Sequence, residues 1–167
     1  MNFEEDIRSF VPFDLIFLDG LHTAEQTFRD FCNSLAVAGS NTVWVLDDTY
    51  PSDVYSLLDS QKEAEKVRRE AANSTAAERA WQGDVFKVPL LIHDYFPQFD
   101  FATTFAGGKG QTVIWRSNRR GFKSKFNYLS EISNLGYLDF IKHKNCLNMR
   151  GSFEDLERYI YSSIGKA

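Results

Sequence analysis

The fold is decided by two short runs, FDLIFLDG at residues 13–20 and TVWVLDD at residues 42–48. The first is an apolar segment that ends in Asp-Gly, which is typical of a strand covered on both faces and therefore central and parallel. The second is another β-rich segment that ends in two acids. Between them Thr23 and Gln26 form a capping box, and apolar residues recur at helical spacing until Gly39, which we expect to stop the helix. Strand, helix and strand form a βαβ unit, so the sequence predicts an α/β fold.

The acids that end these runs are Asp19, Asp47 and Asp48. A right-handed crossover places both strand ends at the same edge of the sheet, where open α/β sheets bind ligands. Clustered carboxylates repel one another and are compensated by Mg²⁺ or Ca²⁺, which leave room for a substrate with paired hydroxyls. His22 is a candidate general base or additional ligand. The alternative is purely local: Asp19 ends the strand in a turn, and the later pair caps a helix that begins near Ser52.

The rest of the chain divides into four parts. Residues 59–79 are polar and suit an exposed helix or a flap, whereas residues 85–96 are an apolar segment whose proline implies a late helix start or a kink. Residues 99–105 and 111–116 are β-rich and predict an antiparallel hairpin. Residues 126–167 have the pattern of helices.

The composition of the chain limits the classes of protein to which it can belong. The chain has 167 residues, 43% of them hydrophobic, which suits one domain with one core. Its net charge of −4 and its pI near 5.4 disfavour nucleic acid and anionic membrane surfaces as partners. We expect a cytoplasmic protein, because no apolar run reaches the roughly 18 residues of a membrane span and residues 1–8 lack the order of a signal peptide. Cys32 and Cys146 form no CxxC pair.

The run at residues 13–22, the Arg29-Asp30 pair and the run at residues 43–48 together resemble the second half of class I S-adenosylmethionine-dependent methyltransferases. They are most similar to the branch that contains catechol-type and sugar or antibiotic O-methyltransferases. The resemblance covers about residues 11–118 and implies a truncated Rossmann-like methyltransferase fold over residues 1–118. Its mixed sheet has the order 4-5-7-6 in the family's strand numbering, with the C-terminal hairpin supplying the antiparallel strand. Residues 119–167 are expected to form a helical extension packed on the same domain.

The resemblance also implies a site. In that family the acid after the fourth strand and the acidic pair after the fifth bind a divalent cation, and these positions correspond here to Asp19 and to Asp47 with Asp48. His22 falls in the accompanying D-G-x-H pattern, which implies a catalytic role. Many relatives carry a further acid at the position of Leu21, where this chain departs from them. The implied activity is transfer of a methyl group from S-adenosylmethionine to a hydroxyl of a small molecule chelated by the metal.

The family's first strand, its glycine-rich turn and the acid that holds the cofactor ribose should precede Phe13, where this sequence has twelve residues. No comparable glycine-rich turn occurs elsewhere, so we expect the chain alone to bind S-adenosylmethionine weakly or not at all. Three explanations stay open: a fragment or shortened gene product, a second chain that completes the site, or a half-fold that has become a noncatalytic module. We expect a partial or degenerate O-methyltransferase, and the alternative is a noncatalytic binding or homo-oligomeric assembly module. The strand at residues 13–18 would then have an unpaired apolar edge, which predicts a homodimer.

Overall fold

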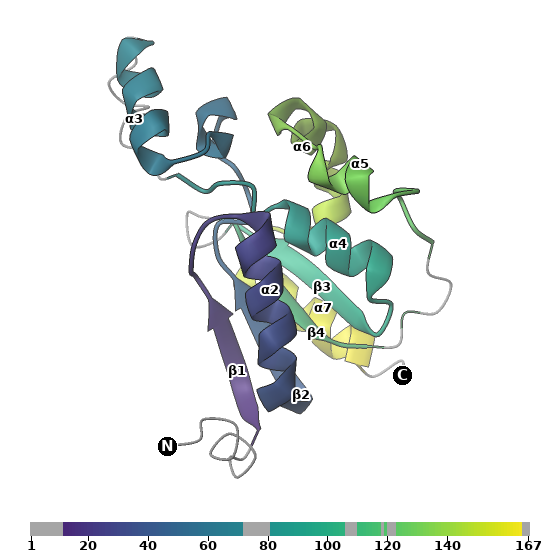
Figure 1. Ribbon diagram of the computed structural model, residues 1–167. Helices are drawn as coiled ribbons and strands as arrows, with labels where there is room; N and C mark the ends of the chain where they lie inside the picture. Colours follow the sequence, from purple (N-terminus) through teal and green to yellow (C-terminus); the bar gives the residue numbers. More distant parts are fainter. Residues whose placement is uncertain (1–11, 72–80, 106–109, 118, 120–122, 165–167) are drawn as a thin grey trace, which may run out of the picture.

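The computed structural model describes residues 12–71, 81–105, 110–117, 119 and 123–164. Its regular elements in chain order are β1 (Phe13–Leu18), α2 (Ala24–Ser34), the 3₁₀ turn η1 (Leu35–Val37), β2 (Ala38–Leu46), η2 (Val54–Leu57), α3 (Gln61–Glu70), α4 (Lys87–Tyr95), β3 (Phe99–Thr104), β4 (Gln111–Arg116), α5 (Leu129–Ser133), α6 (Tyr137–His143), η4 (Lys144–Leu147), β5 (Met149–Arg150) and α7 (Phe153–Ile164). Helices α2 and α4 cover one face of the sheet and α7 covers the other (Figure 1). None of the helices in the described ranges is long and apolar enough to cross a membrane.

The described strands form one mixed sheet in the order β1-β2-β4-β3-β5. β1 is parallel to β2, whereas β4 is antiparallel to both β2 and β3. The predicted order of the first four strands and the predicted hairpin are therefore confirmed. β5 pairs in parallel with β3 inside a region predicted to be helical. A strand of two residues shows no periodicity in the sequence, and for that reason the prediction missed it.

The core lies mainly between the sheet and the helices α2 and α4. The side chains buried there include Phe31, Trp44, Ile92 and Phe101. A second cluster joins α4 to α5 and α6, and a third lies beneath α7. The C-terminal helices thus pack on the same body as the sheet, while the division of the chain after residue 118 remains a prediction.

β1 differs from the expected strand in two respects. It is parallel to β2 as predicted, but it lies at the end of the described sheet, so the prediction of a central strand is wrong for the described strands. Ile16 and Leu18 pack against the core, whereas Phe13, Leu15 and Phe17 point the other way and are 51%, 61% and 52% exposed. The prediction that both faces are covered is therefore also wrong, because α7, which covers the second face, packs mainly against β3 and β5.

Helix α2 begins where the sequence predicts, but it ends before the predicted position. Thr23 caps the helix as predicted, and its hydroxyl accepts the Gln26 backbone N–H at 3.3 Å. The other half of the predicted capping box does not form, because the Gln26 side chain donates to Asp30 Oδ1 at 2.7 Å and the Thr23 N–H donates to the Leu21 carbonyl. The helix ends at Ser34, however, and Gly39 lies inside β2. A Cβ atom at Gly39 would approach the Pro12 Cβ to 2.9 Å, so the glycine allows a close approach of two segments and does not stop the helix.

α3 is the helix expected in the polar stretch, and it is not solvated all round. Its Arg68 side chain is fully buried and forms a forked contact with the Asp53 carboxylate, Nη2 to Oδ1 at 2.9 Å and Nε to Oδ2 at 3.2 Å. Nη2 also donates to the Ser56 hydroxyl at 3.1 Å. This network fixes α3 to η2, a few residues beyond the acidic end of β2. Residues 72–79 of the predicted polar stretch lie outside the described residues.

Candidate functional site

The carboxyl ends of β1 and β2 lie side by side. The strands are in parallel register with Leu18 opposite Leu46. The Asp47 backbone N–H continues the pairing by donating to the Leu18 carbonyl at 3.1 Å. Asp19 and Asp48 follow directly at this edge, so the two strand ends bring the predicted acids into one region.

Asp47 and Asp48 are neighbours in sequence but contact different elements. Asp47 Oδ1 accepts a hydrogen bond from Gln111 Nε2 of β4 at 3.2 Å. Asp48 is only 1% exposed, and its Oδ2 lies 3.3 Å from His22 Nδ1. The Asp48 backbone has a φ of 56°, a left-handed conformation that is uncommon outside glycine, although aspartate and asparagine adopt it more often than most residues, and it costs about 1–3 kcal/mol. This backbone conformation distinguishes Asp48 from Asp47.

His22 lies in the loop between β1 and α2 and is held by contacts on both ring nitrogens. Nδ1 is 2.7 Å from the Trp81 carbonyl oxygen, and Nε2 is 3.5 Å from Asp19 Oδ1. A carbonyl oxygen can only accept, so the proton of the neutral imidazole belongs on Nδ1. The lone pair of Nε2 is then directed toward Asp19, and the Trp81 contact fixes the tautomer in the way that outer partners orient metal-binding histidines.

Trp81 and Gly83 position His22, and neither was among the residues predicted for the site. The Trp81 ring stacks on the imidazole with centroids 5.4 Å apart. Gly83 has a φ of +59°, and a Cβ atom there would lie 1.5 Å from the His22 carbonyl oxygen. Its N–H donates to the Ser56 carbonyl at 2.8 Å. A glycine among larger side chains indicates a special backbone conformation in the sequence, but it does not indicate the partner of that backbone.

These contacts assemble three potential ligands. Asp19, His22 and Asp48 each offer one ligand atom, and these atoms lie within 4.8 Å of one another. Asp47, which the sequence placed in the metal site, is not part of this group. Two carboxylates and one neutral imidazole carry a charge of −2, which a divalent cation would compensate. Because one ligand is nitrogen, the set suits Mn²⁺, Fe²⁺ or Zn²⁺ as well as Mg²⁺.

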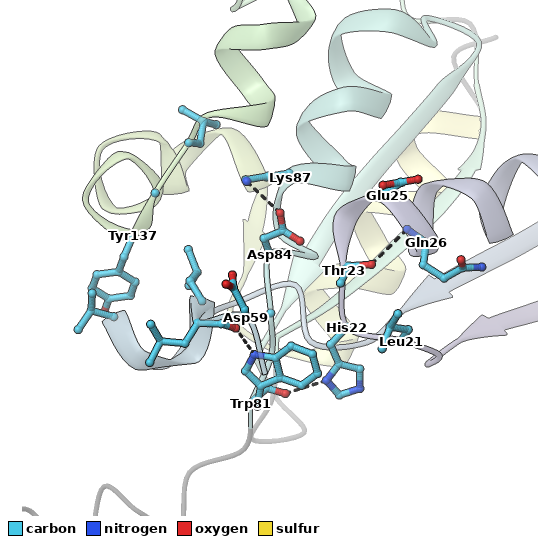
Figure 2. A pocket seen from close by; sticks show the side chains of 16 residues that line it. Leu21, His22, Thr23, Glu25, Gln26, Asp59, Trp81, Asp84, Lys87 and Tyr137 are labelled. Atoms are coloured by element: carbon cyan, nitrogen blue, oxygen red, sulfur yellow. Dashed lines mark hydrogen bonds and ion pairs between the residues drawn. The ribbon is translucent and has the colours of Figure 1, made fainter. Parts of the chain in front are cut away.

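A cavity of about 730 Å³ opens beside His22. Figure 2 shows His22 and Trp81 on one side of it, with Asp84 and Lys87 across from them. Lys87 Nζ donates to Asp84 Oδ2 at 2.9 Å, and Asp84 Oδ1 accepts the Ala24 N–H at the start of α2 at 2.6 Å. The volume is in the range of small-molecule sites, so an organic ligand can reach the imidazole from this side.

The described residues do not offer a comparable place for S-adenosylmethionine. The loop after β1 contains one glycine, Gly20, and β2 is followed by none before Pro51. Neither loop has the glycine-rich turn at a helix N-terminus that lets the backbone approach a nucleotide cofactor.

An α/β domain with a mixed sheet and acids at the carboxyl edge is consistent with a methyltransferase-like fold. The sequence comparison agrees in part: a family model described as a methyltransferase domain matches residues 1–49. The matched segment contains β1, α2, β2 and all four residues predicted for the site, which suggests a transferase. Neither the curated proteins nor the solved structures contain a significant match to this chain.

Proposed function

We propose that Asp19, His22 and Asp48 bind a divalent cation that chelates a hydroxylated small molecule, the acceptor in an O-methyl transfer. The observation that supports the proposal is the group of three ligand atoms within 4.8 Å of one another, which includes His22 at the mouth of an organic-sized cavity. The match of residues 1–49 to a methyltransferase domain supports methyl transfer as the reaction class and S-adenosylmethionine as the methyl donor. Catechol-type, sugar and antibiotic hydroxyls are the acceptors suggested by the sequence resemblance.

When bound, the cation supplies Lewis-acid chemistry, lowering the pKa of a coordinated hydroxyl so that it becomes a nucleophile near neutral pH. The protein's own residues have simpler tasks. Asp19 and Asp48 supply the negative charge that holds the ion. His22 offers Nε2 either as a third ligand or as an acceptor for the hydroxyl proton, while its Nδ1–H stays on the Trp81 carbonyl. The Asp48 carboxylate is buried, and the Trp81 ring covers one face of the imidazole.

A metal titration of paired variants tests the proposal. Asp48→Asn and Asp47→Asn remove the same charge from adjacent buried positions, but only Asp48 belongs to the ligand group. Asparagine tolerates a left-handed φ and can accept from Gln111, so both variants should fold. At a Mn²⁺ concentration about 100 times Kd, binding should stabilise the wild type by about 2.7 kcal/mol, a rise in Tm of roughly 5–10 °C.

Asp47→Asn should keep that rise in Tm and Asp48→Asn should lose most of it. Calorimetric titrations with Mg²⁺, Mn²⁺ and Zn²⁺ then rank the ions. A wild-type protein that responds to none of the three ions, or two variants that respond alike, would refute the site.

The second candidate function is a noncatalytic assembly module, and the exposed face of β1 supports it. Phe13, Leu15 and Phe17 form an apolar row on the last described strand, and such an edge invites pairing with another chain. Antiparallel pairing of two copies centred on Leu15 would place Phe13 opposite Phe17 of the other copy and Asp14 opposite Ile16, so that the two aspartates do not face each other. Light scattering at micromolar concentration should show a dimer that Leu15→Lys dissociates, and a monomeric wild type would exclude it.

A further inference from the structure

His22 has a carboxylate on each side of its ring. Asp48 Oδ2 lies 3.3 Å from Nδ1, and Asp19 Oδ1 lies 3.5 Å from Nε2. Because each ring nitrogen faces an acceptor, the two carboxylates alone do not decide which nitrogen carries the proton of the neutral imidazole. The Trp81 carbonyl, 2.7 Å from Nδ1, adds a closer acceptor on the Nδ1 side (Figure 2). The position of the Trp81 backbone therefore selects the tautomer that leaves the Nε2 lone pair available.

The backbone around Trp81 is fastened on its far side to residues 52–58, which follow β2. The Gln82 side chain is buried, and its Oε1 accepts from both the N–H and the hydroxyl of Ser52, each at 3.3 Å. Trp81 Nε1 donates to the Leu58 carbonyl at 2.7 Å. The chain that carries the Trp81 carbonyl is therefore held between the imidazole and this segment.

Ser56 joins this contact to the buried ion pair of α3. Ser56 is fully buried, and its carbonyl accepts the Gly83 N–H at 2.8 Å. Its hydroxyl donates to Asp53 Oδ1 at 2.9 Å and accepts from Arg68 Nη2 at 3.1 Å. The guanidinium of α3 is thus linked to the backbone of residues 81–83 through a single serine.

We call residues 52–70 the arm. The arm contains η2 and α3, and in Figure 1 α3 stands away from the sheet and is joined to the rest of the molecule through η2. The arm also lines the cavity beside His22 with the side chains of Val54, Leu57, Leu58 and Asp59. One element therefore forms a wall of the cavity and holds the backbone that orients the imidazole.

We propose that the arm positions His22, with Gln82 and Arg68 as positioning residues that act through the Trp81 carbonyl. While the network is intact, the carbonyl keeps the proton on Nδ1. When the network is broken, the carbonyl moves away and the proton is shared between two nitrogens that each face a carboxylate. The inference deepens the proposed function and rests on it for the effect on metal binding, because Nε2 is the candidate ligand atom.

The test reads the tautomer directly, from long-range ¹H–¹⁵N NMR correlation spectra of the histidine rings in the full chain. The His22 signals are assigned by their loss in His22→Gln. Gln82→Met keeps the shape of the side chain but removes the acceptor for Ser52, and Arg68→Lys keeps the charge but not the forked contact with Asp53. Both variants should change the Nδ1–H form of the wild type into a mixture of tautomers. Both should also weaken Mn²⁺ binding about tenfold in calorimetric titrations.

Gln61→Met and Arg69→Lys are the matched controls. Both residues are exposed on α3 and bond to Glu65 of the same helix. They are changed in the same way as Gln82 and Arg68, but they lie outside the network. The controls should keep the tautomer and the Mn²⁺ affinity of the wild type, and circular dichroism verifies that each variant is folded.

The outcomes separate this inference from the metal-site proposal. A wild type with the proton on Nε2 overturns the inference, and so does a folded Gln82→Met or Arg68→Lys variant that keeps the wild-type tautomer. If Mn²⁺ affinity is also unchanged in such a variant, the metal-site proposal stands without the inference. If the tautomer responds as expected but Mn²⁺ binds to no form of the chain, the positioning of His22 stands and the metal-site proposal falls.

Discussion

Replacing Gly83 with alanine tests whether the segment at residues 81–83 positions His22. Gly83 has a φ of +59°, and its missing Cβ leaves the space occupied by the His22 carbonyl, 1.5 Å from the ideal Cβ position. No rotation of a side chain relieves this contact, since the backbone fixes the position of the Cβ atom and its partner is a backbone carbonyl oxygen. The alanine variant must therefore move the His22 loop, the Gly83 segment or both.

The cost has two parts. A left-handed conformation costs alanine about 1–2 kcal/mol, and overpacking of a close contact costs about 1–3 kcal/mol. The sum of about 2–5 kcal/mol corresponds to a fall in Tm of roughly 4–20 °C for a chain of this size. Displacement of His22 should also weaken Mn²⁺ binding to nearly the level of His22→Gln. Thermal unfolding by circular dichroism and calorimetric titration of Mn²⁺ measure the two effects.

Gly151→Ala is the control, because a Cβ atom there meets only Asp155 Oδ2 at an ordinary contact distance of 3.4 Å. It should change stability by no more than about 0.5 kcal/mol and leave Mn²⁺ binding intact. If Gly83→Ala matches this control in both measurements, the reasoning about Gly83 and His22 is wrong. Lost metal binding at unchanged Tm would instead show that the loop moves freely to accommodate the methyl group.

Two further predictions concern the buried network between α3 and η2. Arg68→Ala removes a fully buried guanidinium and leaves the Asp53 carboxylate without its partner. The variant should therefore lose about 3–5 kcal/mol of unfolding free energy, measured by denaturant unfolding. A loss below about 1 kcal/mol would contradict the assigned role. Burial alone raises the pKa of Asp53, but hydrogen bonds from Arg68 and Ser56 and the charge of the guanidinium lower it below its ordinary value. The resulting stabilisation is fully present above about pH 4 and is lost as the pH falls through the lowered pKa. The wild type should therefore lose more unfolding free energy between about pH 5 and pH 2 than Asp53→Asn does. Equal losses in the two proteins would refute the assignment.

The sequence by itself determined the elements whose signals are local. The apolar runs that became β1 and β2, the hydroxyl cap of Thr23 and the hairpin of β3 and β4 each depend on residues a few positions apart, and periodicity and capping reveal them directly. The late start of α4, with Pro89 in its first turn, follows in the same way because proline needs no N–H partner there. The sequence also placed acids at one edge of the sheet.

Only the tertiary structure decided which of those acids lie close to His22. Asp47 and Asp48 are indistinguishable in the sequence, and the left-handed backbone at Asp48, not residue type, joins it to Asp19 and His22. The Trp81 carbonyl that orients His22 is 59 positions away along the chain, and no local pattern encodes so distant a contact. The same holds for the bare face of β1, which was predicted to be covered: the apolar run specifies a strand, but which faces are covered depends on where α2 and α7 pack.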